Sequence, residues 1–371
     1  MPEAKGFKEI GFIDCKGGGQ VVVDGTTAYV GHTTGPEATT IIDVSDPANP
    51  RQIAQIECEH QGVHAHKVRV RDGLMLTNYE SKAYAGEPDA GFQGGLNIFD
   101  VSDPSKPEHI HFWPSAKSGL HRFTYDGRYA YISPELDDYI GNIVMILDLK
   151  DPRNPVEVGR WHMPGQHIGA GEVPTWKDDE HRCHHPIRLG NHLYTSYWHG
   201  GFVILNIDDM ANPKFVSGMD WSPPFVFPTH TCLPIPFDIQ GEKWMVVADE
   251  DAAKLRADAP GAMLWMICVS DLEHPVPVST IQLDDGPRPP RAGCHQPAED
   301  VKGTEIPVAW FAKGLQMVDI SDPFNIKVCA SFQPDVPQGS KQVASNDVCW
   351  DDRGLIYLVD RDRGLNIVER I

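Results

Sequence analysis

A short apolar run that ends in a polar turn recurs seven times along this chain of 371 residues. Most copies continue as Asp-Val-Ser-Asp-Pro or a degenerate form of it. A repeat of about 50 residues with about four strands is typical of a propeller blade. It predicts an all-β fold, a seven-bladed β-propeller of four-stranded blades that forms a single domain over residues 1–371. The seven runs end at Asp43, Asp100, Asp148, Asn206, Cys268, Asp319 and Glu369.

The third unit shows most clearly how one blade is built. His121–Tyr125 is predicted as the first strand, Asp126-Gly127 as a hairpin turn and Tyr129–Ile132 as the second strand. After a polar loop, Ile143–Leu147 is the third strand and Val156–Trp161 the fourth. The same order recurs in the other units.

The last unit contains only three strands, of which the third covers residues 364–369. The N-terminal segment Phe7–Ile13 has the pattern of the missing fourth strand and no unit of its own. We therefore expect it to pair beside the C-terminal strand, which would close the ring and leave no open sheet edge there.

Composition excludes several classes of protein. The net charge of -20 argues against nucleic-acid binding, which needs a basic patch. No apolar stretch approaches the roughly 20 residues of a membrane helix, and Met1–Gly6 lacks the apolar region of a signal peptide. The eight cysteines form no Cys-x-x-Cys pair and show no disulfide framework. We expect a soluble, cytoplasmic protein that binds neither nucleic acid nor membrane.

Five of the seven units place a histidine at the start of the strand expected to be innermost. Strands that meet around one axis bring together side chains that are far apart in the sequence. Neutral imidazole is the commonest metal ligand, and rigid strands fix the geometry of a site in advance. The sequence therefore predicts a metal site in the central channel, with a water-filled, proton-sharing channel as the alternative. The predicted ligands are His66, His121, His185, His230 and His295.

Nearby residues are candidates for catalysis. His64 precedes His66 by two residues and would ligate in its place or share the pocket, while His64 or His199 would assist proton transfer. Asp347 falls at the ring position of the seventh unit, where it would orient a ligand imidazole or have a structural role, and Glu299 has the same two interpretations.

Two other residues near the expected site are interpreted differently. In a regular strand His184 would point to the face opposite His185. Glu250, with Asp249 and Asp251 on either side, is interpreted as part of a solvated acidic loop because the EF-hand spacing is absent.

The apolar run followed by Asp-x-Ser-Asp-Pro-x-x-Pro resembles the LVIVD-repeat β-propellers, and the resemblance extends over nearly the whole chain. Tyr197-Trp198-His199-Gly200-Gly201 and Thr229–Leu233 are similar to segments of the selenium-binding proteins, some of which are copper-dependent methanethiol oxidases. Gly201 stands where that motif has Asp. The resemblance implies a propeller and favours copper.

The function expected from these features is a metal-dependent oxidoreductase or oxygenase that acts on a small organic substrate. Histidine sites without a convergent carboxylate fit copper or iron. The first alternative is a lyase or hydrolase in which manganese or zinc at the same histidines polarises a carbonyl or carboxylate. The second is a non-catalytic interaction scaffold. The oligomeric state is left open.

Overall fold

The computed structural model describes residues 3–60, 62–82, 91–176, 181–251, 261–283 and 291–371. Within these ranges the chain forms antiparallel β-sheets and two short 3-10 helices, η1 (Ile168–Ala170) and η2 (Phe311–Lys313). No helix of the described residues has the length and apolar character that crossing a membrane requires.

The strands of the N-terminal half follow one another in the order predicted for blades. Neighbours in the sequence pair antiparallel from the inside outward. The first sheet contains β3 (Gly18–Asp24), β4 (Thr27–His32), β5 (Glu37–Asp43) and β6 (Arg51–Glu57); the second β7 (Val63–His64), β8 (Val68–Arg71), β9 (Leu74–Ser81), β10 (Gly95–Asp100) and β11 (Glu108–Pro114); the third β12 (Leu120–Tyr125), β13 (Tyr129–Pro134), β14 (Val144–Asp148) and β15 (Val156–Trp161).

The remaining strands repeat this order with two variations. An eight-stranded sheet combines two successive sets of four, because Trp198 pairs with Thr229 across their boundary. Its strands are β16 (His181–Leu189), β17 (His192–Trp198), β18 (Phe202–Asn206), β19 (Lys214–Met219), β20 (Thr229–Pro234), β21 (Trp244–Asp249), β22 (Leu264–Cys268) and β23 (Val276–Ile281); the next sheet has β24 (Gln296–Pro297), β25 (Glu305–Trp310), β26 (Gly314–Asp319), β27 (Lys327–Gln333) and β1 (Glu3–Lys5); the last has β28 (Ser345–Trp350), β29 (Ile356–Asp360), β30 (Gly364–Arg370) and β2 (Phe7–Asp14).

The repeated motif has a local cause. At the end of a third strand, the side-chain oxygen of Asp or Asn accepts a hydrogen bond from the backbone N–H two residues later, which forms the turn toward the fourth strand. Asp148 does so with the N–H of Lys150 at 2.9 Å. The same bond recurs at Asp43, Asp100, Asn206 and Asp319.

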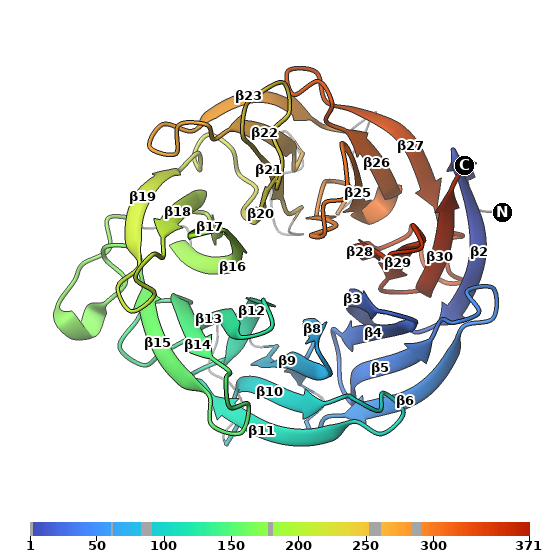
Figure 1. Cartoon of the computed structure of the whole chain (residues 1–371), viewed down its shortest axis with the longest axis horizontal. Helices are drawn as coiled ribbons and strands as arrows, with labels where there is room; N and C mark the ends of the chain where they lie inside the picture. The colour runs from blue at the N-terminus through green and yellow to red at the C-terminus, as the bar shows by residue number, and fades with distance from the viewer. Residues whose placement is uncertain (1–2, 61, 83–90, 177–180, 252–260, 284–290) are drawn as a thin grey trace.

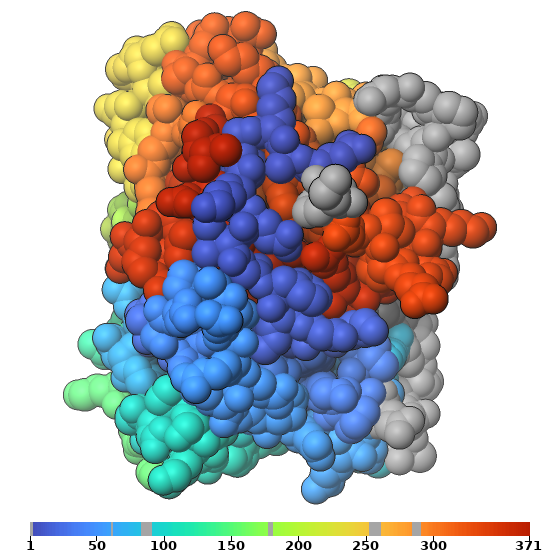
Figure 2. Space-filling model, turned by 90° about the vertical axis from the view of Figure 1, so that its right-hand side faces the viewer, coloured from blue at the N-terminus to red at the C-terminus, as the bar shows by residue number. Residues whose placement is uncertain are grey.

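The N-terminal residues pair with two different sheets. β2 lies antiparallel to β30, from Phe7 opposite Arg370 to Asp14 opposite Gly364. β1 pairs instead with β27 of the preceding sheet, a contact that the sequence did not predict. Figure 2 shows this dark-blue segment against the orange and red C-terminal segments at the outer surface.

The sheets are arranged in a ring (Figure 1). β3, β8, β12, β16, β20 and β28 lie nearest the centre, whereas β6, β11, β15, β19, β23, β27 and β2 form the rim. Apolar side chains from facing sheets fill the space between them, and the second and third strands are deeply buried; Val144, Ile146 and Leu147 are fully enclosed. The innermost strands and the residues just before them bring distant histidines together.

Candidate functional site

Six histidines form a continuous row at the inner strands, called the histidine row below. Neighbouring ring centroids along it lie 3.6, 5.2, 4.8, 4.4 and 4.2 Å apart. Four of the five predicted ligands belong to the row, and all six rings are buried. In order, its members are His64, His66, His121, His184, His230 and His295.

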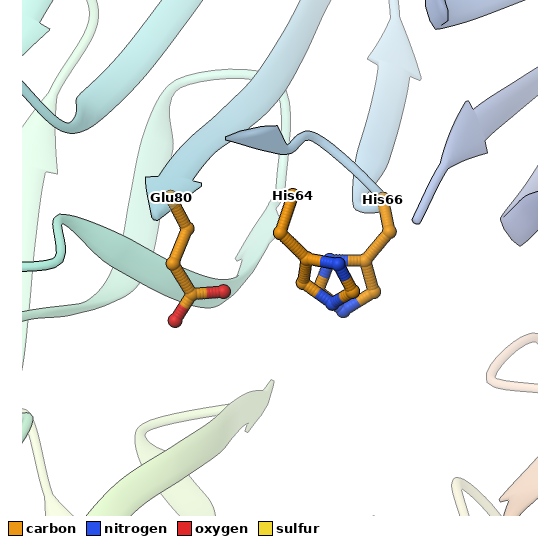
Figure 3. Close-up of side chains that lie close together, drawn as sticks. All are labelled: His64, His66 and Glu80. Atoms are coloured by element: carbon orange, nitrogen blue, oxygen red, sulfur yellow. The ribbon is translucent and has the colours of Figure 1, made fainter. Parts of the chain in front are cut away.

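His64 and His66 lie side by side at the start of the second sheet, and Glu80 extends toward the same space (Figure 3). His64 is directly opposite Glu80 in the pairing of β7 with β9. One ligand atom of each of the three residues lies within 4.8 Å of the others, so they form a group that can hold a metal ion. Sequence reasoning did not identify Glu80, which lies one residue before the end of β9.

The first sheet packs tightly against the segment that carries His66. A Cβ on Gly31 would lie 2.8 Å from the carbonyl carbon of His66, and one on Gly19 would lie 2.5 Å from its Cβ. Contacts this short are not tolerated, so both positions require glycine. Close backbone packing therefore fixes the position of His66.

Most members of the row use Nδ1 for a hydrogen bond. The Nδ1 of His64 lies 2.8 Å from the carbonyl oxygen of Thr33, and that of His184 lies 2.7 Å from the carbonyl oxygen of His230. His230 uses the hydroxyl of Thr231, and His295 the carbonyl oxygen of Asn346. A carbonyl oxygen only accepts, and the Thr231 hydroxyl donates its hydrogen to Gln296, so these Nδ1 atoms carry the proton and a neutral ring keeps its lone pair on Nε2. Metal-binding histidines have this arrangement.

Glu80, His121 and His184 form a hydrogen-bonded chain. The Nδ1 of His121 lies 2.8 Å from a carboxyl oxygen of Glu80, and its Nε2 lies 3.0 Å from the Nε2 of His184. Because His184 donates through Nδ1, its Nε2 accepts, and His121 supplies the hydrogen between them. Burial raises the pKa of Glu80 well above its usual value, which favours a carboxyl proton donated to His121. Each imidazole then carries one hydrogen and is neutral, and the carboxyl group of Glu80 carries one further proton.

The strand β16 departs from the expected register. Its pairing with β17 shifts between His181 and His185, so the side chains do not alternate regularly there. The expectation that His184 points away from the ring was wrong: His184 joins the row. His185 lies beside it, with Nε2 3.5 Å from a carboxyl oxygen of Glu299.

A second group of potential ligands contains His184, His230 and Glu250, again with ligand atoms within 4.8 Å of one another. The side chain of Glu250 is only 14% exposed and lies 3.9 Å from the Nε2 of His295. The interpretation of Glu250 as part of a solvated loop was therefore wrong. Two carboxylates, Glu80 and Glu250, accompany the histidines.

Burial also determines the charge of the row. It lowers the pKa of His64 to about 3. Burial also lowers the pKa of the other five members well below the usual value, and the nearby cation Lys67 lowers it in addition. The rings are therefore neutral at pH 7, which is the form that binds a metal.

A buried ion-pair network adjoins the row. The guanidinium of Arg122 is 3.0 Å from Glu299, which also pairs with Arg69, and Arg122 is 3.3 Å from the Nε2 of His230. Asp347 accepts a hydrogen bond from the N–H of Val21 at 3.1 Å. Burial raises the pKa of Asp347 to about 6 although Arg122 and Lys67 oppose the increase. Asp347 is thus a buried carboxyl group held by the backbone of β3.

His199 occupies the turn between β17 and β18 and is partly exposed. Its ring lies 6.1 Å from that of Trp198, whose ring lies 5.0 Å from His184. His199 is therefore separated from the histidine row by one aromatic side chain, whereas His64, the other residue predicted to move protons, is part of the row.

Comparison with known proteins supports the fold. The family model described as "LVIVD repeat" matches residues 18–56, 90–111 and 301–333. No curated protein matches the sequence at a significant level, and the similarity to selenium-binding proteins was not found by these comparisons.

Solved propeller structures resemble the chain over most of its length. The WD40 repeats of RRP9 share 9% identity with a TM-score of 0.61, covering 100% of this chain and 99% of that one. A streptogramin B lyase shares 11% identity with a TM-score of 0.58, covering 98% and 97%. The periplasmic gluconolactonase of Pseudomonas aeruginosa shares 13% identity with a TM-score of 0.57, covering 84% and 85%. At such identities the likeness establishes the propeller-like, all-β fold alone.

Proposed function

We propose that the protein is a seven-bladed propeller enzyme that binds a divalent metal at the histidine row and acts as a lyase or hydrolase on a small organic substrate. The blade count treats the eight-stranded sheet as two blades, because only the pair of Trp198 with Thr229 joins its halves. In this arrangement the pairing of β2 with β30 closes the ring.

One observation carries the proposal of a metal enzyme: two groups, each with two histidines and one glutamate, lie in a single buried row. From the sequence, copper or iron was favoured because no carboxylate was expected at the histidines, and the resemblance to selenium-binding proteins favoured copper. Glu80 and Glu250 remove that premise, since mixed imidazole and carboxylate ligands suit zinc, manganese and ferrous iron. Bound there, the metal would polarise a carbonyl or carboxylate oxygen of the substrate.

The residues around the ligands would position and move protons. A metal bound at Glu80 requires its carboxylate form, so in the chain from Glu80 through His121 to His184 the ring of His121 would then carry the proton and exchange it along the hydrogen bonds. Arg122 would hold the ring of His230 in position, and Glu299 would hold the ring of His185. These residues support reactions that need proton transfer, and elimination and hydrolysis are reactions of this kind.

A metal-dependent oxidoreductase is the second candidate function. Two histidines and one carboxylate are the ligand set of many ferrous oxygenases. This form of the proposal uses iron rather than copper, with Glu80 or Glu250 as the carboxylate.

Metal analysis of the untagged, full-length protein tests the proposal. We expect stoichiometric zinc, manganese or iron, and a binding constant that weakens at least tenfold in the Glu80→Gln variant because a ligand loses its charge. The matched control is Glu157→Gln, which changes an exposed ion pair with Arg160. Protein without stoichiometric metal, and without metal uptake after incubation with these ions, would contradict the proposal and favour an interaction scaffold. Activity that requires oxygen would select the oxidoreductase.

A further inference from the structure

A cavity of about 490 Å³ lies between the first and second sheets, which are neighbours in the ring (Figure 1). β5 and β6 line it from one side, and β9, β10 and β11 from the other. Its volume is within the range of about 300–1,000 Å³ that is typical of pockets for small organic molecules. Tyr79 lines the cavity, whereas the next residue, Glu80, belongs to a metal-ligand group, because successive side chains of a strand point to opposite faces. The cavity is therefore a separate site from the histidine row.

The second sheet provides a wall of fixed shape. Thr77 lies opposite Asn97, and Asn97 lies opposite Phe112, so the three side chains form one row across β9, β10 and β11. The amide oxygen of Asn97 accepts a hydrogen bond from the Nε2 of His109 at 3.1 Å. Side chains that are paired across strands in this way hold one another in place. The shape of this wall is thus set before a ligand binds.

Aromatic rings form one corner of the cavity. The ring of Phe112 is inclined by 86° to that of Tyr79, and their centroids lie 6.0 Å apart. Phe92 stacks on Tyr79 at 5.6 Å and holds its ring in this orientation. Phe99 lies deeper and is only 8% exposed, whereas Tyr79 and Phe112 are partly exposed. The faces of aromatic rings attract cations, so this corner suits a positively charged group with an apolar surface.

The charges at the cavity also favour a cation. The carboxylates of Glu57 and Glu59 belong to its lining, and both residues are exposed. No lysine or arginine is among the described residues that line it. The net charge of -20 attracts cations to the protein as a whole. A metal ion would need several converging oxygen ligands and would gain nothing from the aromatic walls, whereas an organic cation can use both the carboxylates and the rings.

We propose that this cavity binds a small organic cation, in which an alkylated ammonium group is attached to an apolar body. The ammonium group would lie against the rings of Tyr79 and Phe112, with the carboxylates of Glu57 and Glu59 nearby. The proposal goes beyond the proposed function and is independent of it, because the described residues that line the cavity include no member of the histidine row.

Three probes with a similar branched head group and different charge test this proposal. They are the cation choline, its neutral carbon analogue 3,3-dimethylbutan-1-ol and the anion pivalate. Their binding to the full-length protein, freed of metal with EDTA and dialysed, is measured by saturation-transfer NMR at low ionic strength. We expect choline to bind at least about fivefold more tightly than the neutral alcohol, because the aromatic rings and the carboxylates both act on its charge. Pivalate should bind more weakly than the alcohol.

Matched variants locate the binding. Phe112→Leu should weaken choline binding at least about threefold, whereas Phe324→Leu, at an exposed ring outside the cavity, should leave it unchanged. The double variant Glu57→Gln and Glu59→Gln should reduce the preference for choline over the alcohol. Glu157→Gln, which changes a carboxylate outside the cavity, should preserve that preference. Circular dichroism and Tm compare the fold of each variant with the wild type.

Several outcomes would overturn the proposal. The first is the absence of detectable choline binding, and the second is binding of the alcohol or of pivalate that equals or exceeds that of choline. The third is choline binding that stays unchanged in the Phe112→Leu variant and in the double glutamine variant, since the cation would then bind elsewhere. Because Glu57 and Glu59 are exposed, their variant decides the question even if Phe112→Leu does not fold.

Discussion

Acid should destabilise the fold through its buried histidines, well above the pH at which surface carboxylates titrate. Burial lowers the pKa of both His64 and His185 to about 3, against about 6.5 in an unfolded chain. Below pH 6.5 the unfolded state therefore binds one more proton at each residue than the folded state does. Their contribution to stability is complete above pH 6.5 and is lost as the pH falls toward 3.

The size of the effect follows from the linkage relation. Each histidine lowers the free energy of unfolding by about 1.4 kcal/mol per pH unit, hence by about 2 kcal/mol from pH 6.5 to 5.0 and by about 4 kcal/mol for the two together. Asp347 acts in the opposite direction, because its folded pKa is raised to about 6 and the folded state gains a proton below that value. It restores about 1.4 kcal/mol by pH 5, which leaves a loss of about 2.6 kcal/mol from these three groups. The other five histidines of the row add to this loss because burial lowers their pKa as well, whereas Asp249 and Glu80 reduce it because burial raises theirs.

Urea unfolding of the metal-free protein, followed by circular dichroism at pH 7.5, 6.5 and 5.0, measures this loss. His185→Gln should remove about 2 kcal/mol of the pH dependence. His274→Gln is the matched control, because His274 is an exposed residue that pairs with Asp271 at the surface. A free energy of unfolding that stays constant or rises between pH 6.5 and 5.0 would refute the assignment of neutral, buried histidines.

Three further outcomes are expected. Glu299→Gln should lower the free energy of unfolding by about 3 kcal/mol in urea titrations, because the buried guanidinium of Arg122 and the partly buried one of Arg69 lose their carboxylate partner. Glu157→Gln at an exposed pair should cost less than about 1 kcal/mol. Gly31→Ala forces a Cβ against the backbone of His66 and should weaken metal binding in a titration at least about tenfold; Gly303→Ala, with open space around its Cα, should not. Zinc or manganese at about 100 times its dissociation constant should raise the free energy of unfolding by about 2.7 kcal/mol, and an unchanged urea midpoint would argue against a metal site in the folded state.

The sequence predicts what is local and repeated in this fold. The turn at Asp148 depends on a side chain and a backbone N–H two residues apart, so the motif itself indicates where the third strand ends. The strand Val156–Trp161 has the bounds expected for it. The N-terminal segment was matched to its C-terminal partner because the last unit lacked a fourth strand, and β2 pairs with β30.

The site was less accessible to sequence reasoning because it depends on register and on long-range packing. Alternation along β16 selected His185, but the register shift brings His184 into the row. Glu80 lies opposite His64 because β7 pairs with β9, and no local sequence pattern predicts that pairing. Lys67 and Arg122 each directly follow a predicted ligand, and that adjacency was the available signal for the buried cations.

The double attachment of the N-terminal segment has a consequence for biosynthesis. β1 and β2 are translated long before their partners β27 and β30, because about 320 residues or more separate the paired strands. Until then the first strands have unpaired edges that can associate with other chains, and the contacts that complete the fold span almost the entire sequence, which slows folding. Nascent chains stalled before residue 327 should therefore be more sensitive to proteases and more dependent on chaperones than the released protein.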